Sequence, residues 1–211
     1  MKFNLLAKVR FISIGMFAFL LGTFVAITTL AWFPGVTPRQ DKVFERPSLI
    51  GPQIVEIVEI GTKSKKANFG EAFKEDGEWL KGTNFKVRNH SGKEIVYLEL
   101  RCDFPETASS GNEMSFPVKL GRWPNVENQK GEPVLIKPDE EVAIALSDDV
   151  YSRLKRFIEY RQPISSINKV RAYLSFVIFS DGIGWNGIEF LRQDSSDPKH
   201  YINIGPTPPQ R

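Results

Sequence analysis

The sequence predicts a mainly β protein, an antiparallel β-sandwich with one short helix, preceded by a single N-terminal transmembrane helix. Three observations support this fold class. Residues 11–33 carry no charge. Several later segments alternate apolar and polar residues and are separated by turn residues, as in half-buried strands. One segment after Ser147 instead has the apolar spacing of a helix.

The uncharged stretch is long enough to cross a bilayer. A helix rises about 1.5 Å per residue, so residues 11–33 reach about 34 Å, and the hydrocarbon core is about 30 Å thick. Pro34-Gly35 then ends the helix. The alternative is a cleaved signal peptide, with Thr29-Leu30-Ala31 as its cleavage site. Because signal peptides have shorter apolar regions, we favour an uncleaved signal anchor, with the lipid bilayer as the partner of residues 11–33.

Basic residues flank this stretch on both sides and therefore do not fix its orientation. Moving the short, triply basic N-terminal tail across the membrane is unfavourable. We expect residues 1–10 to be cytoplasmic and the C-terminal domain to be periplasmic or extracellular.

Small residues recur every four positions within the predicted span, at Ala18, Gly22 and Ala26. They share one helix face, which would let two copies approach closely and form a homodimer. The alternative is that glycine and alanine are simply common in membrane helices.

Charge and cysteine content exclude several classes of protein. The chain has 28 basic and 25 acidic residues, and residues 1–33 hold three basic and no acidic ones, so the remainder is neutral at 25 and 25. A neutral domain lacks the positive surface of a nucleic-acid binder. Cys102 is the only cysteine, which excludes an internal disulfide and a cysteine metal cluster. We expect no cofactor and no metal.

Proline placement suggests the domain boundaries. Residues 34–52 contain four prolines among charged residues and are predicted to be a stiff linker. Residues 53–204 are predicted to be the β-sandwich domain. Residues 205–211, Gly-Pro-Thr-Pro-Pro-Gln-Arg, are predicted to be a disordered tail.

The clearest strand runs over residues 96–104, where apolar residues alternate with polar ones. Residues 85–88 alternate in the same way, and the turn sequence 89–93 joins the two segments as a predicted hairpin. Other predicted strands lie at residues 53–60, 116–120, 134–136, 142–146, 170–179, 185–191 and 201–204.

The predicted helix covers residues 148–160. Ser147 is a favourable N-cap, acidic residues follow it, and Pro163 prevents continuation. Two antiparallel sheets would pack face to face, with two inward sets forming one core. These sets are Val96, Leu98 and Leu100, and Val142, Ile144 and Leu146.

The stretch from Phe85 to Leu100, FKVRNHSGKEIVYLEL, resembles the opening hairpin of bacterial FxLYD-type and related immunoglobulin-like exported domains. The segment from Leu135 to Val142 is similar to a later turn in such domains. The ending, from Phe179 through Trp185 to Tyr201, resembles uncharacterised membrane-anchored envelope proteins. The Tyr-Asp pair of the motif is missing, and Asp103-Phe104 stands near its place. The resemblance implies an immunoglobulin-like exported sandwich and supplies no catalytic residues.

No residue set indicates a reaction. The two histidines, His90 and His200, lie among turn residues, and neither accompanies a nucleophile motif. Asp181, Asp194 and Asp197 could supply oxygen ligands to calcium, but their spacing is that of ordinary turns. Asn89-His-Ser91 matches a glycosylation sequon on a predicted turn, which matters only in a eukaryotic secretory route.

Three tryptophans lie beside turn residues and are the candidate binding residues: Trp79, Trp123 and Trp185. Such side chains can stack on sugars or anchor a protein partner, although burial at the ends of the core is the favoured interpretation. We therefore expect a membrane-anchored, non-catalytic binding or structural module of the cell envelope, with another envelope protein or a surface polymer as partner. The alternatives are a carbohydrate-binding module and a hydrolase with a carboxylate pair.

Overall fold

The computed structural model describes residues 39–48, 53–124, 131–197 and 200–206. The predicted cytoplasmic tail, the transmembrane helix with its small-residue face, and tail residues 207–211 lie outside the described residues. Within the described ranges, no helix is both long and apolar enough to cross a membrane.

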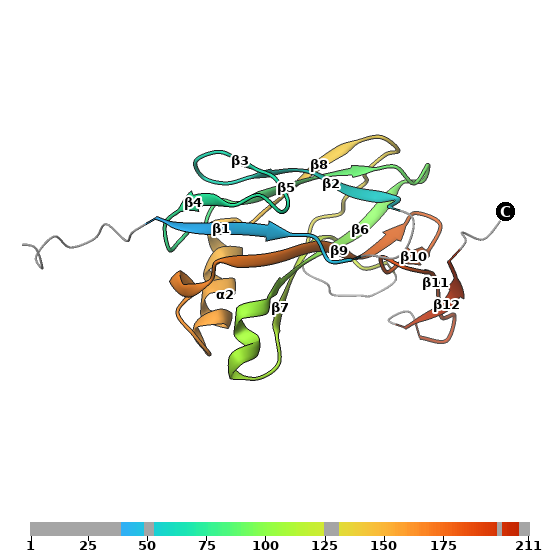
Figure 1. Cartoon of the computed structure of the whole chain (residues 1–211). Coiled ribbons are helices and arrows are strands. Elements are labelled where there is room, and N and C mark those ends of the chain that lie inside the picture. The colour runs from blue at the N-terminus through green and yellow to red at the C-terminus, as the bar shows by residue number, and fades with distance from the viewer. Residues whose placement is uncertain (1–38, 49–52, 125–130, 198–199, 207–211) are drawn as a thin grey trace, which may run out of the picture. The chain divides into compact units, whose positions relative to one another are not determined.

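The described residues form a mainly β domain of two sheets and one α-helix, consistent with a β-sandwich (Figure 1). The eight-stranded sheet contains β1 (Gln40–Glu45), β4 (Phe73–Glu75), β6 (Ile95–Phe104), β7 (Met114–Gly121), β9 (Lys169–Phe179), β10 (Ile183–Trp185), β11 (Phe190–Gln193) and β12 (Tyr201–Gly205). The four-stranded sheet contains β2 (Val55–Gly61), β3 (Lys66–Ala67), β5 (Asn84–Asn89) and β8 (Glu141–Ala145). The helices are η1 (Pro105–Ser110), α2 (Asp148–Glu159) and η2 (Ile164–Ser166).

Strand β9 organises the larger sheet. One of its edges pairs antiparallel with β6, which pairs in turn with β7. Its other edge pairs with β1 near the start of β9 and with β10 near the end. The β1–β9 pairing is parallel, with Phe44 opposite Val170. The prediction of purely antiparallel sheets is therefore wrong at β1.

The linker predicted over residues 34–52 is also wrong in part, because residues 40–45 form β1. This strand lies between β9 and β4, and its inward side chains, Lys42 and Phe44, are fully buried. The Phe44 ring packs against Trp79 with centroids 5.0 Å apart. The folded domain therefore begins more than ten residues before the predicted boundary at residue 53.

The hairpin predicted between residues 85–88 and 96–104 does not form. Both strands exist, but β5 pairs with β2 and β8, whereas β6 pairs with β7 and β9. The turn at residues 89–93 therefore crosses from one sheet to the other. Two further strand predictions also need correction. Residues 134–136 contribute only an isolated bridge between Ile136 and Ile95, and a turn at residues 186–189 splits the strand predicted over residues 185–191.

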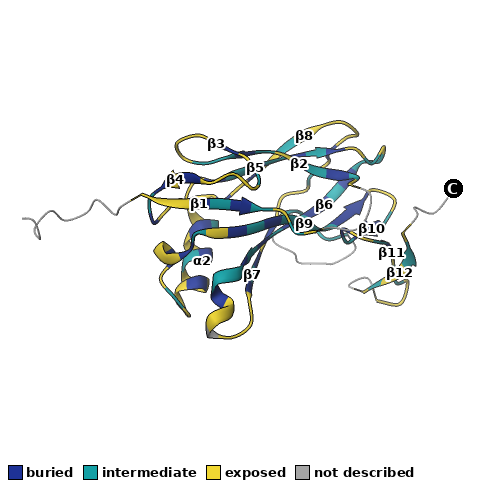
Figure 2. Ribbon diagram, in the orientation of Figure 1, coloured by how far each residue is buried: buried dark blue, intermediate teal, exposed yellow. Residues whose placement is uncertain are grey.

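The core lies between the two sheets, and the helix covers part of it (Figure 2). Leu98 and Leu100 of β6 share one hydrophobic cluster with Ile144 of β8 and with Leu146, as expected for opposing faces. Val96 is only half-buried, because the β6–β9 register shifts between Ile95 and Tyr97. Helix α2 begins where predicted, and the Ser147 hydroxyl accepts a hydrogen bond from the Val150 amide.

Candidate binding face

The outer face of the eight-stranded sheet carries an unusual concentration of half-buried polar groups. Residues directly opposite each other in paired strands point to the same face. Three cross-strand rows result, one centred on each outward side chain of the middle of β6. The rows are Lys119–Glu99–Phe176, Pro117–Arg101–Tyr173 and Ser115–Asp103–Arg171. We call Glu99, Arg101, Asp103, Tyr173 and Ser175 the polar row.

Hydrogen bonds hold the polar row in place. One Glu99 carboxylate oxygen accepts from the Ser175 hydroxyl at 2.7 Å and from Arg101 Nη2 at 3.2 Å. The Asp103 carboxylate accepts from the Ser115 hydroxyl at 2.5 Å. Arg101 Nε is buried and has no hydrogen-bond partner within the described residues. The row therefore contains one unpaired donor that lies beneath the surface.

Burial and nearby negative charge change the titration of two tyrosines on this face. Desolvation raises the pKa of Tyr97, and the Glu99 carboxylate adds to the effect. Desolvation also raises the pKa of Tyr173, with a further contribution from Asp103. The Tyr97 phenol is buried beside Glu99, whereas the Tyr173 phenol is half-buried on the face.

An aromatic cluster of Tyr97, Trp123, Phe176 and Tyr201 adjoins the polar row. The indole of Trp123 stacks on the Phe176 ring, with centroids 5.0 Å apart and planes 4° apart. Tyr97 and Tyr201 meet the Trp123 ring edge-on. The half-buried Phe176 lies opposite Glu99 in the β6–β9 ladder, so the cluster and the row adjoin on one face. The buried Tyr97 hydroxyl lies 3.5 Å from Glu99 Oε2 beneath this face.

A surface hollow of about 680 Å³ opens beside Trp123. It lies where the end of β7, the β9–β10 turn and β11 come together. The polar side chains lining it include Arg122, Asp181 and Gln193. Of the three candidate tryptophans, Trp123 is thus the one that borders both a hollow and a polar surface.

The other two candidate tryptophans belong to the core. Trp79 and Trp185 are both 0 % exposed. The Trp79 indole N–H donates to the Ile167 carbonyl at 2.9 Å. Neither ring can stack on a ligand without unfolding its surroundings, so the expectation of binding residues is wrong for both and the core interpretation is right.

The most deeply buried cation, Lys42, belongs to a structural cluster. Its ammonium donates to the Ile167 carbonyl at 2.9 Å and to Asn168 Oδ1 at 2.8 Å. Glu106 accepts from the backbone amides of Asn168 and Lys169. Burial lowers the pKa of Lys42, although the charges of Glu106 and Asp76 act in the opposite direction. A third bond goes to Gln40 Oε1 at 3.2 Å, so all three N–H groups of the ammonium are used and Lys42 holds β1 against the start of β9.

The remaining reactive and metal-binding residues lie apart. Cys102 is buried, and desolvation raises the pKa of its thiol to about 12, so it is not a nucleophile. Asp194 pairs with His200, whereas Asp181 pairs with Lys93. No group of three or more His, Cys, Asp or Glu side chains in the described ranges is arranged to hold a metal ion.

The two carboxylates of the polar row are poorly arranged for carboxylate-pair catalysis. Glu99 and Asp103 are four residues apart on β6, about 13 Å along the strand. Arg101 stands between them. Sequence reasoning identified their outward parity but not the row, because only the pairing of β6 with β9 brings Tyr173 and Ser175 beside them.

No family model, curated protein or solved structure matches this chain.

Proposed function

We propose that this protein is a membrane-anchored, exported β-sandwich whose outer sheet face binds another envelope protein or a surface polymer without catalysing a reaction. The observation that carries the proposal is the continuity of the aromatic cluster with the polar row. A flat indole beside fixed carboxylate, guanidinium and hydroxyl groups provides stacking and directional hydrogen bonding in one patch.

The anchor and the export rest on residues 11–33, whose length and lack of charge fit a signal anchor. An immunoglobulin-like relationship is part of this proposal and is supported by the two-sheet arrangement and by the FKVRNHSGKEIVYLEL stretch. The domain would then be periplasmic or extracellular, where surface polymers and other envelope proteins are within reach.

A carbohydrate ligand is the second candidate. Trp123 favours it, because its ring lies between the 680 Å³ hollow and the polar row. Sugars present apolar ring faces that stack on indoles and hydroxyls that bond to carboxylate and guanidinium groups. Trp79 and Trp185 would not contact the carbohydrate.

Site-specific photocross-linking in intact cells tests the proposal. A photoreactive residue replaces Lys119, which is exposed and lies opposite Glu99 on the same face. A matched control replaces Ala143, which is exposed on β8 of the other sheet. We expect an adduct from position 119 and none from position 143, and we expect the Trp123→Ala substitution to abolish it.

Co-sedimentation of the full-length chain with purified cell-wall polysaccharide separates the two ligand classes. Binding that Trp123→Ala and Arg101→Ala weaken at least about tenfold supports the carbohydrate version. Two results together would contradict the proposed binding face. These are equal adducts from positions 119 and 143, and sedimentation that neither substitution changes.

A further inference from the structure

Helix α2 presents an outer face whose side chains are mostly exposed to solvent. Its buried side chains are Tyr151, Leu154 and Ile158, which pack into the core. On the outside, Arg153, Arg156, Phe157 and Tyr160 follow the spacing i, i+3, i+4, i+7 and so share one stripe. We call these four residues the α2 outer face. Tyr160 is 87 % exposed and Phe157 is 38 % exposed, which is unusual for large aromatic side chains.

The cations of this face are largely available. Arg156 forms no ion pair with another residue in the described part of the chain, and it is exposed. Arg153 holds only Asp149, one turn earlier, at 3.2 Å, and both side chains are open to solvent. The nearby acid Glu159 lies 4.0 Å from Lys155, which also binds Glu78 at 3.0 Å. Positive charge and aromatic surface therefore coincide at the C-terminal end of the helix.

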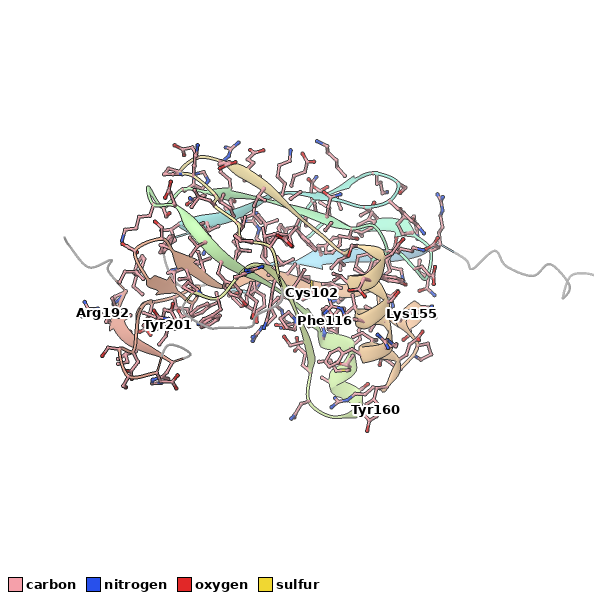
Figure 3. All side chains as sticks on the ribbon, turned by 180° about the vertical axis from the view of Figure 1, so that it is seen from behind. Cys102, Phe116, Lys155, Tyr160, Arg192 and Tyr201 are labelled. Carbon is pink, nitrogen blue, oxygen red and sulfur yellow. The ribbon has the colours of Figure 1, made fainter. Side chains whose placement is uncertain are left out.

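This helix end is held rigidly. The Phe157 ring lies 5.8 Å from the Phe116 ring of β7, centroid to centroid. Just past the helix, the Arg161 guanidinium donates to the Asn112 carbonyl in the connection between η1 and β7. Figure 3 shows Tyr160 at the outer margin of the molecule, beyond Phe116. The exposed aromatic side chains thus lie on a helix end that is attached to β7 and to the connection before it.

Helix α2 lies toward the end of the domain where β1 begins, and Tyr160 projects at the lower margin of the view in Figure 3. Figures 1 and 3 view the domain from opposite sides, and both place α2 toward that end. The contacts agree, because α2 packs against η2, and the Ile167 carbonyl that follows η2 accepts from Lys42 near the start of β1.

The corrected domain boundary makes the connection to the predicted membrane span very short. The span ends at residue 33 and β1 begins at residue 40, which leaves the six residues 34–39 between them. Six extended residues reach about 20 Å at most. A linker running to residue 52 would have reached about three times as far. In a chain anchored through residues 11–33 as proposed, this length would limit how far the start of β1 can lie from the bilayer surface.

We infer that the α2 outer face rests on the headgroup region of an anionic bilayer. Tyrosine and phenylalanine favour the interface, where a ring can be buried while a hydroxyl stays wet. Arginines bind lipid phosphates bidentately and are attracted to a negatively charged leaflet. The inference rests on the proposed membrane anchor. The α2 outer face is small, and an unanchored domain that diffuses freely would bind lipid through it only weakly.

The test uses the full-length chain in lipid nanodiscs, with Cys102→Ala as background. A single cysteine replaces Tyr160 and carries an environment-sensitive fluorophore. The matched control label replaces Asn203, which is exposed on β12. In discs containing anionic phosphatidylglycerol, we expect headgroup-spin-labelled lipid to quench position 160 at least about threefold more than position 203. In purely zwitterionic discs, the ratio of quenching at position 160 to quenching at position 203 should fall to about one. The same ratio is expected for the Arg153→Glu/Arg156→Glu variant in anionic discs.

Failure of the inference and failure of the anchor give different results. A chain that does not incorporate into nanodiscs at all contradicts the proposed anchor. A chain that incorporates, but whose positions 160 and 203 are quenched equally in anionic discs, contradicts docking by α2 and leaves the anchor intact. Preferential quenching that survives both arginine substitutions contradicts the electrostatic part of the inference.

Discussion

The side-chain amide of Asn89 donates a hydrogen bond to the Ile136 carbonyl, with 3.1 Å between nitrogen and oxygen. The same amide also donates to the carbonyls of Lys93 and Lys137, and its oxygen accepts from Ser91. Asn89 thus ties the turn that crosses between the sheets to the segment leading into β8. Its side chain is fully buried, which makes it unavailable as a glycosylation acceptor in the folded protein.

Replacing Asn89 should therefore cost much more than its turn position suggests. In Asn89→Ala, three main-chain carbonyls lose a buried donor, and we expect the free energy of unfolding to fall by about 2–4 kcal/mol. Urea unfolding of the full-length chain in detergent, followed by circular dichroism, measures the change. Asn203→Ala, at an exposed position, is the control and should cost under about 1 kcal/mol. Equal costs for the two variants would contradict the role of Asn89.

The start of the domain can be tested by truncation. A chain beginning at residue 39 retains β1 and should give a cooperative unfolding transition. A chain beginning at residue 53 loses Phe44, whose ring lies 5.0–5.8 Å from those of Trp79, Phe85 and Phe73. Loss of one such core aromatic alone costs about 3–5 kcal/mol. We expect the shorter chain to aggregate or to lack a transition in calorimetry, and a native-like transition would restore the linker interpretation of residues 40–45.

Lys42 should leave a signature in the pH dependence of stability. Its pKa in the folded state is lowered by burial. Between that pKa and the ordinary value near 10.5, the unfolded chain binds more protons than the folded one, so stability rises with pH. This contribution is absent from Lys42→Met. The difference in free energy of unfolding, wild type minus Lys42→Met, should therefore increase as pH rises toward 10.5.

Denaturant titrations at several pH values, from neutral to about 10, provide that measurement. Lys119→Met, at an exposed position on β7, is the control against which the pH dependence of Lys42→Met is compared. A flat difference for Lys42→Met would mean that Lys42 titrates like a solvent-exposed lysine.

Substitutions of Trp79 and Trp123 should have different effects on stability and on ligand binding. Trp79→Ala removes a fully buried ring and its hydrogen bond to Ile167, and we expect a loss of about 3–5 kcal/mol in unfolding free energy. Trp123→Ala removes a half-buried ring at the surface and should cost about half as much or less. Ligand capture at position 119 should show the opposite order, disappearing in Trp123→Ala but persisting in folded Trp79→Phe.

The strands that the sequence predicted well are those with an apolar face of their own. Alternation placed Leu98, Leu100 and Cys102 inward on β6, and the N-cap at Ser147 placed the start of α2. Strand β1 escaped prediction because one of its two inward residues is a lysine, which breaks the apolar pattern. Its burial depends on acceptors at Ile167 and Asn168, more than 120 positions away.

The sequence also did not indicate which strands pair with each other. Alternation reveals the two faces of a strand but not its neighbours, so the turn after Asn89 was interpreted as an ordinary hairpin. The polar row was hidden for the same reason, since Glu99 and Ser175 become neighbours only through the β6–β9 ladder. Trp123 could be named from its turn context, but its stacking on Phe176 could not.

The parallel alignment of β1 with β9 has a mechanical consequence. β1 is the first strand of the domain and is bonded on both sides, to β9 and to β4. Tension along the strand axis would load the β4 ladder at residues 40–42 and the β9 ladder at residues 43–45. The hydrogen bonds of Lys42 to Ile167 and Asn168 add further attachment near the start of the strand. In a chain anchored as proposed, a pull from the membrane would therefore meet β1 first.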